Sequence, residues 1–404
     1  MHRLVLGLAI SLSLFAQTRD QRWQEDIRFA QSEILRIHPN PFTKVTRDTF
    51  NQAFTELLNN VASKSDFEVQ AELARIVASI GDGHTSAPIP AIQTRLLPIR
   101  LRWFPDGLFV TAASEPQIRL LGKQVVSIGG KSAEEAYAAV KPYIANEFDL
   151  WARLLSGSQN YMVSPDLLRL AGVSSDASRV SIAVRETDGS TFEATLEPVQ
   201  VALVTAPYLS RPLAPLYRRS PQQAYWYEYL GDSRTLYVKY NQCRNVPALP
   251  MSKFSDDVLA TATSNPVDRV VFDLRNNGGG DSSVIAILLN KLAEAFMRGT
   301  INPSKGAFVI VGRETFSSGV NNTVDLKQNG VVVVGEPTGQ GGSHFGQVVQ
   351  IVLPNSRITL STSTRLFSLP GYEIGTILPD IAVDLTSTDF FADRDPVLEA
   401  VLAR

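Results

Sequence analysis

Residues 306–342 have the sequence GAFVIVGRETFSSGVNNTVDLKQNGVVVVGEPTGQGG, and this stretch decides the fold that we expect. An apolar run at 307–311 ends in a polar turn, and apolar residues then recur at helical spacing until Gly330. The four valines at 331–334 are typical of a strand that is buried on both faces of a parallel sheet. The stretch therefore predicts one strand–helix–strand unit.

Ser317 lies where the first strand of this unit gives way to the helix. The first N–H groups of a helix have no partner within it, and together with the positive end of the helix dipole they can stabilise an oxyanion. Ser317 is therefore a candidate nucleophile. The alternative is that Ser317 or Ser318 only caps the helix.

The composition limits the classes of protein. The chain has 404 residues, of which 44% are hydrophobic and 19% charged, so it can bury a large core in two or three domains. A net charge of −2 without a block of basic residues argues against nucleic acid or an anionic membrane as the main partner. The single cysteine, Cys243, excludes an internal disulfide and a cysteine-ligated zinc site.

The first 16 residues, MHRLVLGLAISLSLFA, combine a basic start with a short apolar run. The run is too short to span a bilayer, so we interpret residues 1–16 as a signal peptide. The mature protein is then exported, periplasmic or extracellular, without a stable membrane span. A buried N-terminal helix is the alternative.

Residues 17–90 have the pattern of a helical domain. Three segments with apolar residues at helical spacing are followed by the turn Gly81-Asp82-Gly83-His84-Thr85. Two glycines shortly before a histidine free the backbone to direct the imidazole, so His84 is a candidate base. The alternative is a histidine that packs in a turn and forms local hydrogen bonds.

The rest of the chain divides into three parts. Short alternating runs at 91–200 predict a β-rich domain with a helical insertion, and 201–224 is a proline- and arginine-rich linker or lid. Alternating strands and helices at 225–404 predict an α/β core with a mostly parallel sheet. Sites in such sheets form beyond the carboxyl ends of the strands, where both Ser317 and the glycines at 278–280 lie.

The triple glycine does not match a phosphate-binding loop. Asp281-Ser282-Ser283 follows it, without the lysine of a Walker loop, and the spacing of a dinucleotide loop is absent. A backbone N–H at Gly279 or a neighbour fits better as an oxyanion donor, because glycine allows close approach to a carbonyl.

Several groups that could activate Ser317 can be excluded. Thr315 breaks the Gly-x-Ser-x-Gly elbow, and no Ser-x-x-Lys occurs. Lys327, the only lysine after Ser317, lies about 15 Å away along the expected helix. Outside the signal, His38, His84 and His344 remain, and His38 at a helix stop is expected to be structural.

Five motifs carry a resemblance to a known family. They follow the order seen in the tail-specific, or C-terminal processing, serine peptidases: Gly81-Asp82-Gly83-His84-Thr85, FDLRNNGGG at 272–280, Thr315-Phe316-Ser317-Ser318, Gly335-Glu336-Pro337-Thr338 and Pro379-Asp380-Ile381. The resemblance implies a PDZ-like domain at 91–200 and a ClpP/crotonase-like core at 225–404. It also implies a Ser317 nucleophile, with oxyanion N–H groups from Ser318, Gly278 and Gly279.

The sequence departs from the best-known branch of this family, which carries a catalytic lysine shortly after the Gly-Glu-Pro-Thr motif. This chain has Gly339-Gln340-Gly341-Gly342 there. It resembles instead the branch of the tricorn protease core, which implies His84 as base and Glu373, six residues before Pro379, as the acid. Gly83 stands where that branch has a serine, and Thr85 is a candidate substitute.

The sequence thus predicts an exported serine peptidase that acts on peptides or proteins. His84 takes the proton of Ser317 and returns it to the leaving amine, and Glu373 orients the site. His344 is a rival base. We expect no cofactor and no metal; a site of Asp82, His84 and His344 is conceivable, but no His-Glu-x-x-His pair supports it. The alternative function is a peptide- or lipid-binding protein on the same scaffold.

Overall fold

The structure, a computed structural model, describes residues 17–186, 188–200 and 214–404. The predicted signal peptide and residues 201–213 of the predicted linker lie outside this range. The described chain is a mixed α/β protein with several sheets, which confirms the predicted fold class. Among the described helices, none combines the length and apolar character that a membrane crossing requires.

Three helices form the N-terminal part, as the apolar spacing predicted. They are α1 Arg19–Ile37, α2 Arg47–Asn60 and α3 Asp66–Ala78. Capping boxes at Thr18 and Ser65 satisfy the first N–H groups of α1 and α3. The turn that carries His84 follows α3 directly, so the end of this helix sets its position.

The middle part is built on a sheet with the strand order β2-β3-β4-β6-β7. The strands of this part are β1 Arg95–Leu96, β2 Ile99–Phe104, β3 Gly107–Ala113, β4 Gln124–Ile128, β5 Lys131–Ser132, β6 Val180–Arg185, β7 Thr191–Leu196 and β8 Val199–Gln200. Its helices are α4 Ala133–Val140, α5 Asp149–Ser158 and α6 Pro165–Leu170. Helix α5 contacts β2 and extends from the middle part toward the C-terminal core.

The C-terminal core contains a six-stranded sheet with the order β16-β13-β12-β11-β10-β9. Its strands are β9 Tyr225–Leu230, β10 Thr235–Tyr240, β11 Arg269–Asp273, β12 Ala307–Val311, β13 Val332–Gly335 and β16 Ile381–Ala382. All neighbouring pairs are parallel except β9 with β10. The predicted mostly parallel sheet is therefore present.

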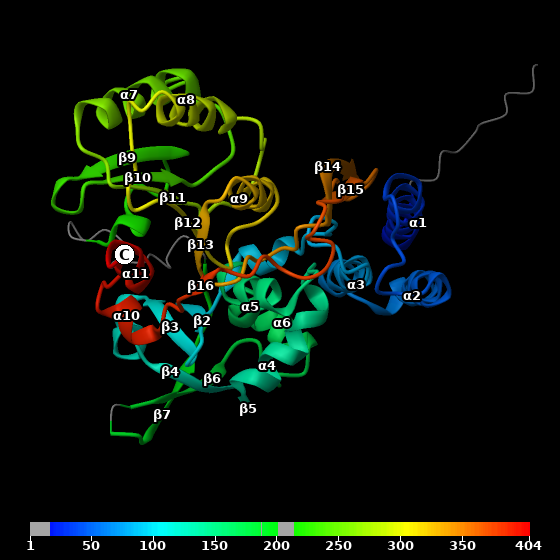
Figure 1. Cartoon of the computed structure of the whole chain (residues 1–404). Helices are drawn as coiled ribbons and strands as arrows, with labels where there is room; N and C mark the ends of the chain where they lie inside the picture. Colours follow the sequence, from blue (N-terminus) through cyan, green and yellow to red (C-terminus); the bar gives the residue numbers. More distant parts are fainter. Residues whose placement is uncertain (1–16, 187, 201–213) are drawn as a thin grey trace, which may run out of the picture.

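Helices cover both faces of this sheet (Figure 1). They are α7 Met251–Ser264, α8 Ala286–Met297, α9 Ser318–Gln328, α10 Ser387–Phe391 and α11 Pro396–Leu402. One apolar cluster joins α7 and α8 to the sheet, and a second joins α11 to its other face. Helix α8 begins four residues later than the predicted 282, because the Asp281 carboxylate accepts the Ser283 N–H and holds a turn there.

A two-stranded hairpin, β14 His344–Val352 with β15 Thr359–Phe367, leaves the core and packs beside α1 (Figure 1). The buried Asp26 of α1 accepts the N–H groups of Asn355 and Ser356 in the hairpin turn. Ser86 forms a β-bridge with Ser361 of β15. The hairpin thereby ties the turn of His84 to the C-terminal core.

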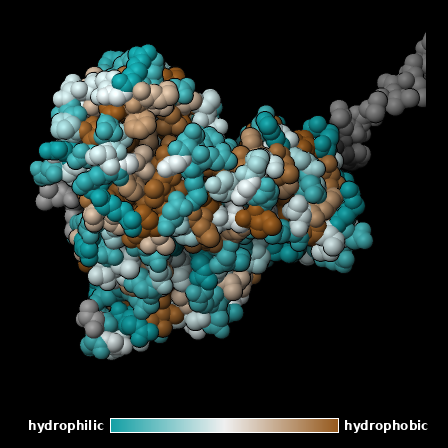
Figure 2. All heavy atoms as spheres, viewed as in Figure 1, coloured by the Kyte–Doolittle hydropathy of each residue, from teal (hydrophilic) through white to brown (hydrophobic). Residues whose placement is uncertain are grey.

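In space-filling view, the core and the N-terminal helices form two lobes with a concave outline between them, and apolar residues gather over the middle of the core lobe (Figure 2).

Candidate active site

Ser317 follows β12 and is the N-cap residue of α9, at the predicted junction of strand and helix. Its backbone has φ 51° and ψ −127°, a conformation that costs a residue with a side chain free energy. Its side chain forms no capping hydrogen bond with the helix. The strained turn therefore leaves the Ser317 hydroxyl uncommitted to the helix, as a nucleophile requires.

Ser318 has a different task. Its hydroxyl donates to the carbonyl oxygen of Gly280 at 2.6 Å, which ties the start of α9 to the triple-glycine turn. The geometry does not favour the alternative in which one of these serines only caps the helix. The Ser317 side chain makes no cap contact, and the Ser318 hydroxyl binds the neighbouring turn.

The triple-glycine turn presses against Ser317. A Cβ on Gly279 would lie 2.6 Å from the Ser317 Cβ and 3.0 Å from both its Oγ and the backbone N of Ser318. Gly279 also has φ +105°, so both space and backbone require glycine here. The N–H of Gly279 donates to the Asn277 side chain at 2.9 Å, so this predicted oxyanion donor already has a partner. The space beside Gly278 is open.

The ring of His84 packs against Phe316, the residue next to Ser317. Its ring centroid is 4.7 Å from that of Phe316, which in turn stacks on Trp151 of α5 at 4.0 Å. A Cβ on Gly83 would approach the Phe316 ring to 2.9 Å, so the glycine that replaces the expected serine allows this packing. The structure therefore brings together His84 and Ser317, which lie far apart in the sequence, in one site.

The buried side chain of Gln340 joins the two residues. Its Oε1 accepts the backbone N–H of Ser317 at 2.8 Å, while its Nε2 donates to His84 Nδ1 at 3.2 Å and to Glu147 Oε1 at 3.0 Å. Because the backbone N–H of Ser317 can only donate, the orientation of the Gln340 amide is fixed. Nδ1 of His84 is consequently an acceptor, and the neutral imidazole carries its hydrogen on Nε2.

Burial controls the protonation of this site. It lowers the pKa of His84 to about 4, although the nearby Asp82 carboxylate opposes the shift. Burial also raises the pKa of Glu147 to about 8, and the hydrogen bond from Gln340 offsets only part of this effect. At neutral pH, His84 is therefore unprotonated and Glu147 is predominantly protonated.

Asp82 stabilises the turn of His84 through hydrogen bonds. Burial disfavours its charged form, but hydrogen bonds from His38, Ser363 and Thr85 outweigh this and hold its pKa below the usual value. One of its oxygens also accepts the backbone N–H of His84 at 2.9 Å. His38 is structural, as predicted from its place at a helix stop, because its Nε2 lies 3.1 Å from Asp82.

Two further candidates have roles that differ from the predicted ones. Thr85 is buried and donates to Asp82 at 2.5 Å, so it supports the turn. His344, the rival base, is buried at the start of β14, and its ring stacks on that of His84 with the ring centroids 6.1 Å apart. Its Nδ1 lies 3.0 Å from the Gly341 carbonyl, and burial lowers its pKa.

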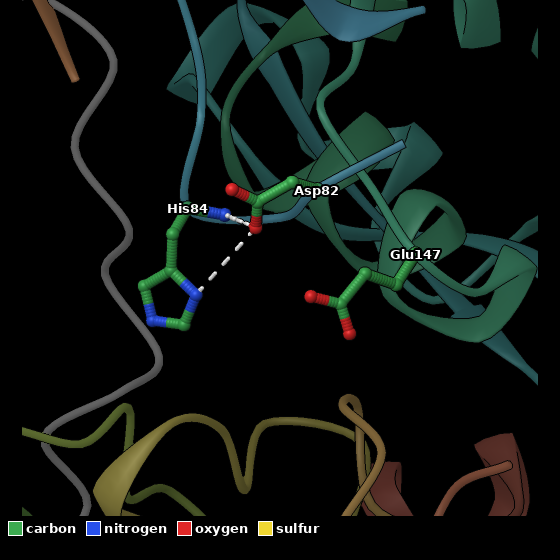
Figure 3. Close-up of side chains that lie close together, drawn as sticks. All are labelled: Asp82, His84 and Glu147. Carbon is green, nitrogen blue, oxygen red and sulfur yellow. Dashed lines mark hydrogen bonds and ion pairs between the residues drawn. The ribbon is translucent and has the colours of Figure 1, made fainter. Parts of the chain in front are cut away.

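Glu373 lies apart from this arrangement. It is exposed, and its carboxylate accepts the N–H of Gly371 at 2.9 Å. Among the interactions of the described residues, none joins Glu373 to Ser317 or His84. The carboxyl groups near His84 are those of Asp82 and of Glu147, which lies on the loop before α5 and is joined to His84 through Gln340 (Figure 3).

Sequence reasoning missed Glu147 and Gln340. Glu147 belongs to no motif, so nothing local indicates it. Gln340 had a usable signal, because it stands in the segment where the best-known branch carries its catalytic lysine. A polar residue at that place indicates a side chain directed toward the nucleophile.

Buried polar contacts also fix the two loops of the site relative to each other. Lys239 of β10 is fully buried, and its ammonium group lies 3.0 Å from both Asp273 and the Asn276 side-chain oxygen. The Asn276 amide donates to Glu314 at 2.8 Å, which links the glycine turn to the loop of Ser317. Lys327 pairs with Asp380 near the other end of α9, in agreement with its exclusion as a base.

A cavity of about 530 Å³ lies between the middle part and the carboxyl ends of the core strands. Arg102 of β2, Gly157 of α5, and Asn276 and Glu314 of the core are among the residues that line it. Its volume is in the range of ligand pockets. Asn276 and Glu314 belong to the two site loops, but Ser317 and His84 are not among the described residues that line the cavity.

Comparison with known proteins supports this fold. No protein-family model matches the chain, and no curated protein matches its sequence. Among solved structures, mature CPAF complexed with lactacystin has a TM-score of 0.64 at 14% identity, with 95% of this chain and 97% of that chain covered. Mature CPAF alone has a TM-score of 0.62 at 15% identity, with 95% and 96% covered.

A photosystem II D1 C-terminal processing protease also matches, over 96% of this chain and 97% of its own, at 14% identity and a TM-score of only 0.39. The two CPAF matches show that the chain has the CPAF fold along nearly its whole length.

Proposed function

We propose that this protein is a serine peptidase in which Ser317 is the nucleophile and His84 the base. The observation that carries the proposal is the backbone of Ser317, strained at φ 51° between a strand and a helix, with its side chain uninvolved in capping. Strain of this kind persists where the surrounding structure enforces it, and it concentrates at active sites. The neutral imidazole beside it supports the assignment.

The reaction follows from these groups. Ser317 Oγ attacks the substrate carbonyl and passes its proton to His84, which then gives it to the leaving amine. Gly278 and Ser318 supply backbone N–H groups for the oxyanion. Water then attacks the acyl group on Ser317, His84 again takes the proton, and Ser317 is regenerated.

Gln340 and Glu147 act as positioning residues in this scheme. Among the described hydrogen bonds, none joins Ser317 Oγ to His84, and the two residues meet through the Gln340 amide. Catalytic contacts are often long without substrate and tighten in the complex. Substrate binding is expected to release Nδ1 of His84 from Gln340, or to turn the ring, so that a free lone pair faces the hydroxyl.

Peptides or proteins are the proposed substrates, and the cavity beside the site is where we expect part of the substrate chain to bind. Export is supported by the composition of residues 1–16. The alternative, a protein on the same scaffold that binds peptide or lipid without turnover, makes the opposite prediction for the reactivity of Ser317.

Labelling with a fluorophosphonate probe tests the proposal. The folded wild-type protein is expected to react at Ser317, and Ser317→Ala is expected to abolish the label. Ser318→Ala should retain much of it, because Ser318 contributes a backbone N–H and a bond to Gly280. Label that survives Ser317→Ala would refute the assignment, and an unreactive wild-type protein would support the binding alternative.

A further inference from the structure

Asp82, His84 and Glu147 form a compact cluster of groups that bind metals. One ligand atom from each residue lies within 4.8 Å of the other two, and Asp82 Oδ1 is 3.9 Å from His84 Nδ1 (Figure 3). The residues come from two segments, the turn after α3 and the loop before α5. Asp82 and His84 have side chains that are 0% and 11% exposed, so this is not a chance group of surface acids.

The spacing is close to what a zinc ion needs. Zinc binds imidazole nitrogen and carboxylate oxygen at about 2.0–2.2 Å, which places ligand atoms of a tetrahedral site roughly 3.3–3.6 Å apart. The three atoms would therefore have to approach one another by at most about 1.5 Å. Gly81 and Gly83 flank the ligands on the turn, where the backbone can make such an adjustment.

The outer contacts of the cluster are already in place. Oδ2 of Asp82 accepts hydrogen bonds from Thr85, Ser363 and His38, so Oδ1 is the oxygen directed toward the His84 ring. Glu147 is held by a hydrogen bond with the backbone of Gly83. Outer contacts of this kind orient the ligands of protein metal sites.

The Gln340 amide occupies the place that a cation would take. Its Nε2 donates at once to Glu147 Oε1 and His84 Nδ1, so a carboxyl oxygen and an imidazole lone pair converge on one partially positive group. Two acceptors that share one donor in a buried site are also well disposed to share a cation, which would displace the amide.

We propose that Asp82, His84 and Glu147 bind one divalent transition-metal ion of the zinc type, and that the bound ion inhibits the peptidase. The inhibition rests on the proposed function, whereas the binding does not. A metal on Nδ1 leaves the imidazole hydrogen on Nε2, so the ring has no lone pair to accept the Ser317 proton.

Cobalt(II) is a suitable probe, because it replaces zinc and shows visible absorption when it is bound in a low-coordinate site. Titration of the purified, metal-free protein is expected to give one ion per chain, which zinc displaces. Glu147→Gln and Asp82→Asn should each weaken the affinity about tenfold or more, because each replaces a carboxylate ligand of the ion with an amide. Glu373→Gln is the matched control and should bind like the wild type.

The proposed site would be overturned if both variants bound cobalt as tightly as the wild type. It would also be overturned if the wild type did not bind one cobalt ion per chain. If circular dichroism shows that Asp82→Asn does not fold, the affinity of Glu147→Gln still decides.

Fluorophosphonate labelling tests inhibition. Zinc should slow labelling at the concentrations at which it binds, and a chelator should restore the rate. If the zinc-loaded protein is labelled at the same rate as the metal-free protein, inhibition by the ion is refuted. If the protein binds cobalt but the metal-free form does not react with the probe, only the proposed peptidase function is refuted.

Discussion

The two sides of the candidate site are held in different ways. On the side of Ser317, backbone geometry dominates: the serine sits in a strained turn, and Gly279 approaches it so closely that no side chain fits. On the side of His84, side-chain hydrogen bonds dominate, through Gln340 and Glu147. The first side is fixed by the sheet and its turns, whereas the second depends on contacts between segments far apart in the sequence. Substitutions should therefore act differently on the two sides.

The largest effect is expected from His84→Ala. Loss of general acid–base catalysis costs about 10²–10⁴-fold, so the rate of fluorophosphonate labelling should fall by at least two orders of magnitude. His344→Ala is the control, because its ring stacks on His84 while its Nδ1 is engaged with the Gly341 and Gly342 carbonyls. If the His344 variant loses labelling while a folded His84 variant keeps it, the base is misassigned.

Gly279→Ala is expected to have the second-largest effect on the labelling rate. The new methyl group would lie 2.6 Å from the Ser317 Cβ, and φ +105° disfavours alanine. A displacement of the nucleophile by about 1 Å can cost roughly 100-fold, which labelling kinetics would detect. Gly278→Ala is the matched control, because it keeps the backbone N–H of residue 278 and nothing lies within 4 Å of its added Cβ. Equal losses in both variants would show that Ser317 is not positioned by close contact with Gly279.

The smallest effect of the three is expected from Glu147→Ala. It leaves the Gln340 amide without one of its partners, at a cost of about 1.4 kcal/mol, or roughly tenfold in labelling rate. Glu147→Gln should recover most of this loss at pH 7, because burial raises the pKa of Glu147 to about 8 and the native group is already neutral. Glu373→Ala should have no measurable effect. A loss in the Glu373 variant and none in the Glu147 variants would restore the carboxylate predicted from the sequence.

The difference between Glu147 and Glu373 also shows where sequence reasoning reaches its limit. Glu373 was chosen for its distance along the chain from Pro379, and a spacing of this kind does not say how the loop folds. Its side chain turns to Gly371 and remains in solvent. Glu147 carries no motif, and only the packing of α5 against the loop of Ser317, through Trp151 and Phe316, brings it near His84.

The sequence by itself determined the elements and the chemical candidates. The helical N-terminus, the parallel core sheet, Ser317 at its junction and the two glycine-rich turns follow from apolar periodicity and from glycine, which act over a few residues. Only the tertiary structure decided which carboxyl group and which amide meet His84, and that His344 is buried. Those contacts join positions 84, 147 and 340, and burial sets the pKa values of His84 and Glu147. Desolvation depends on everything that covers a group, so no local pattern of residues can encode it.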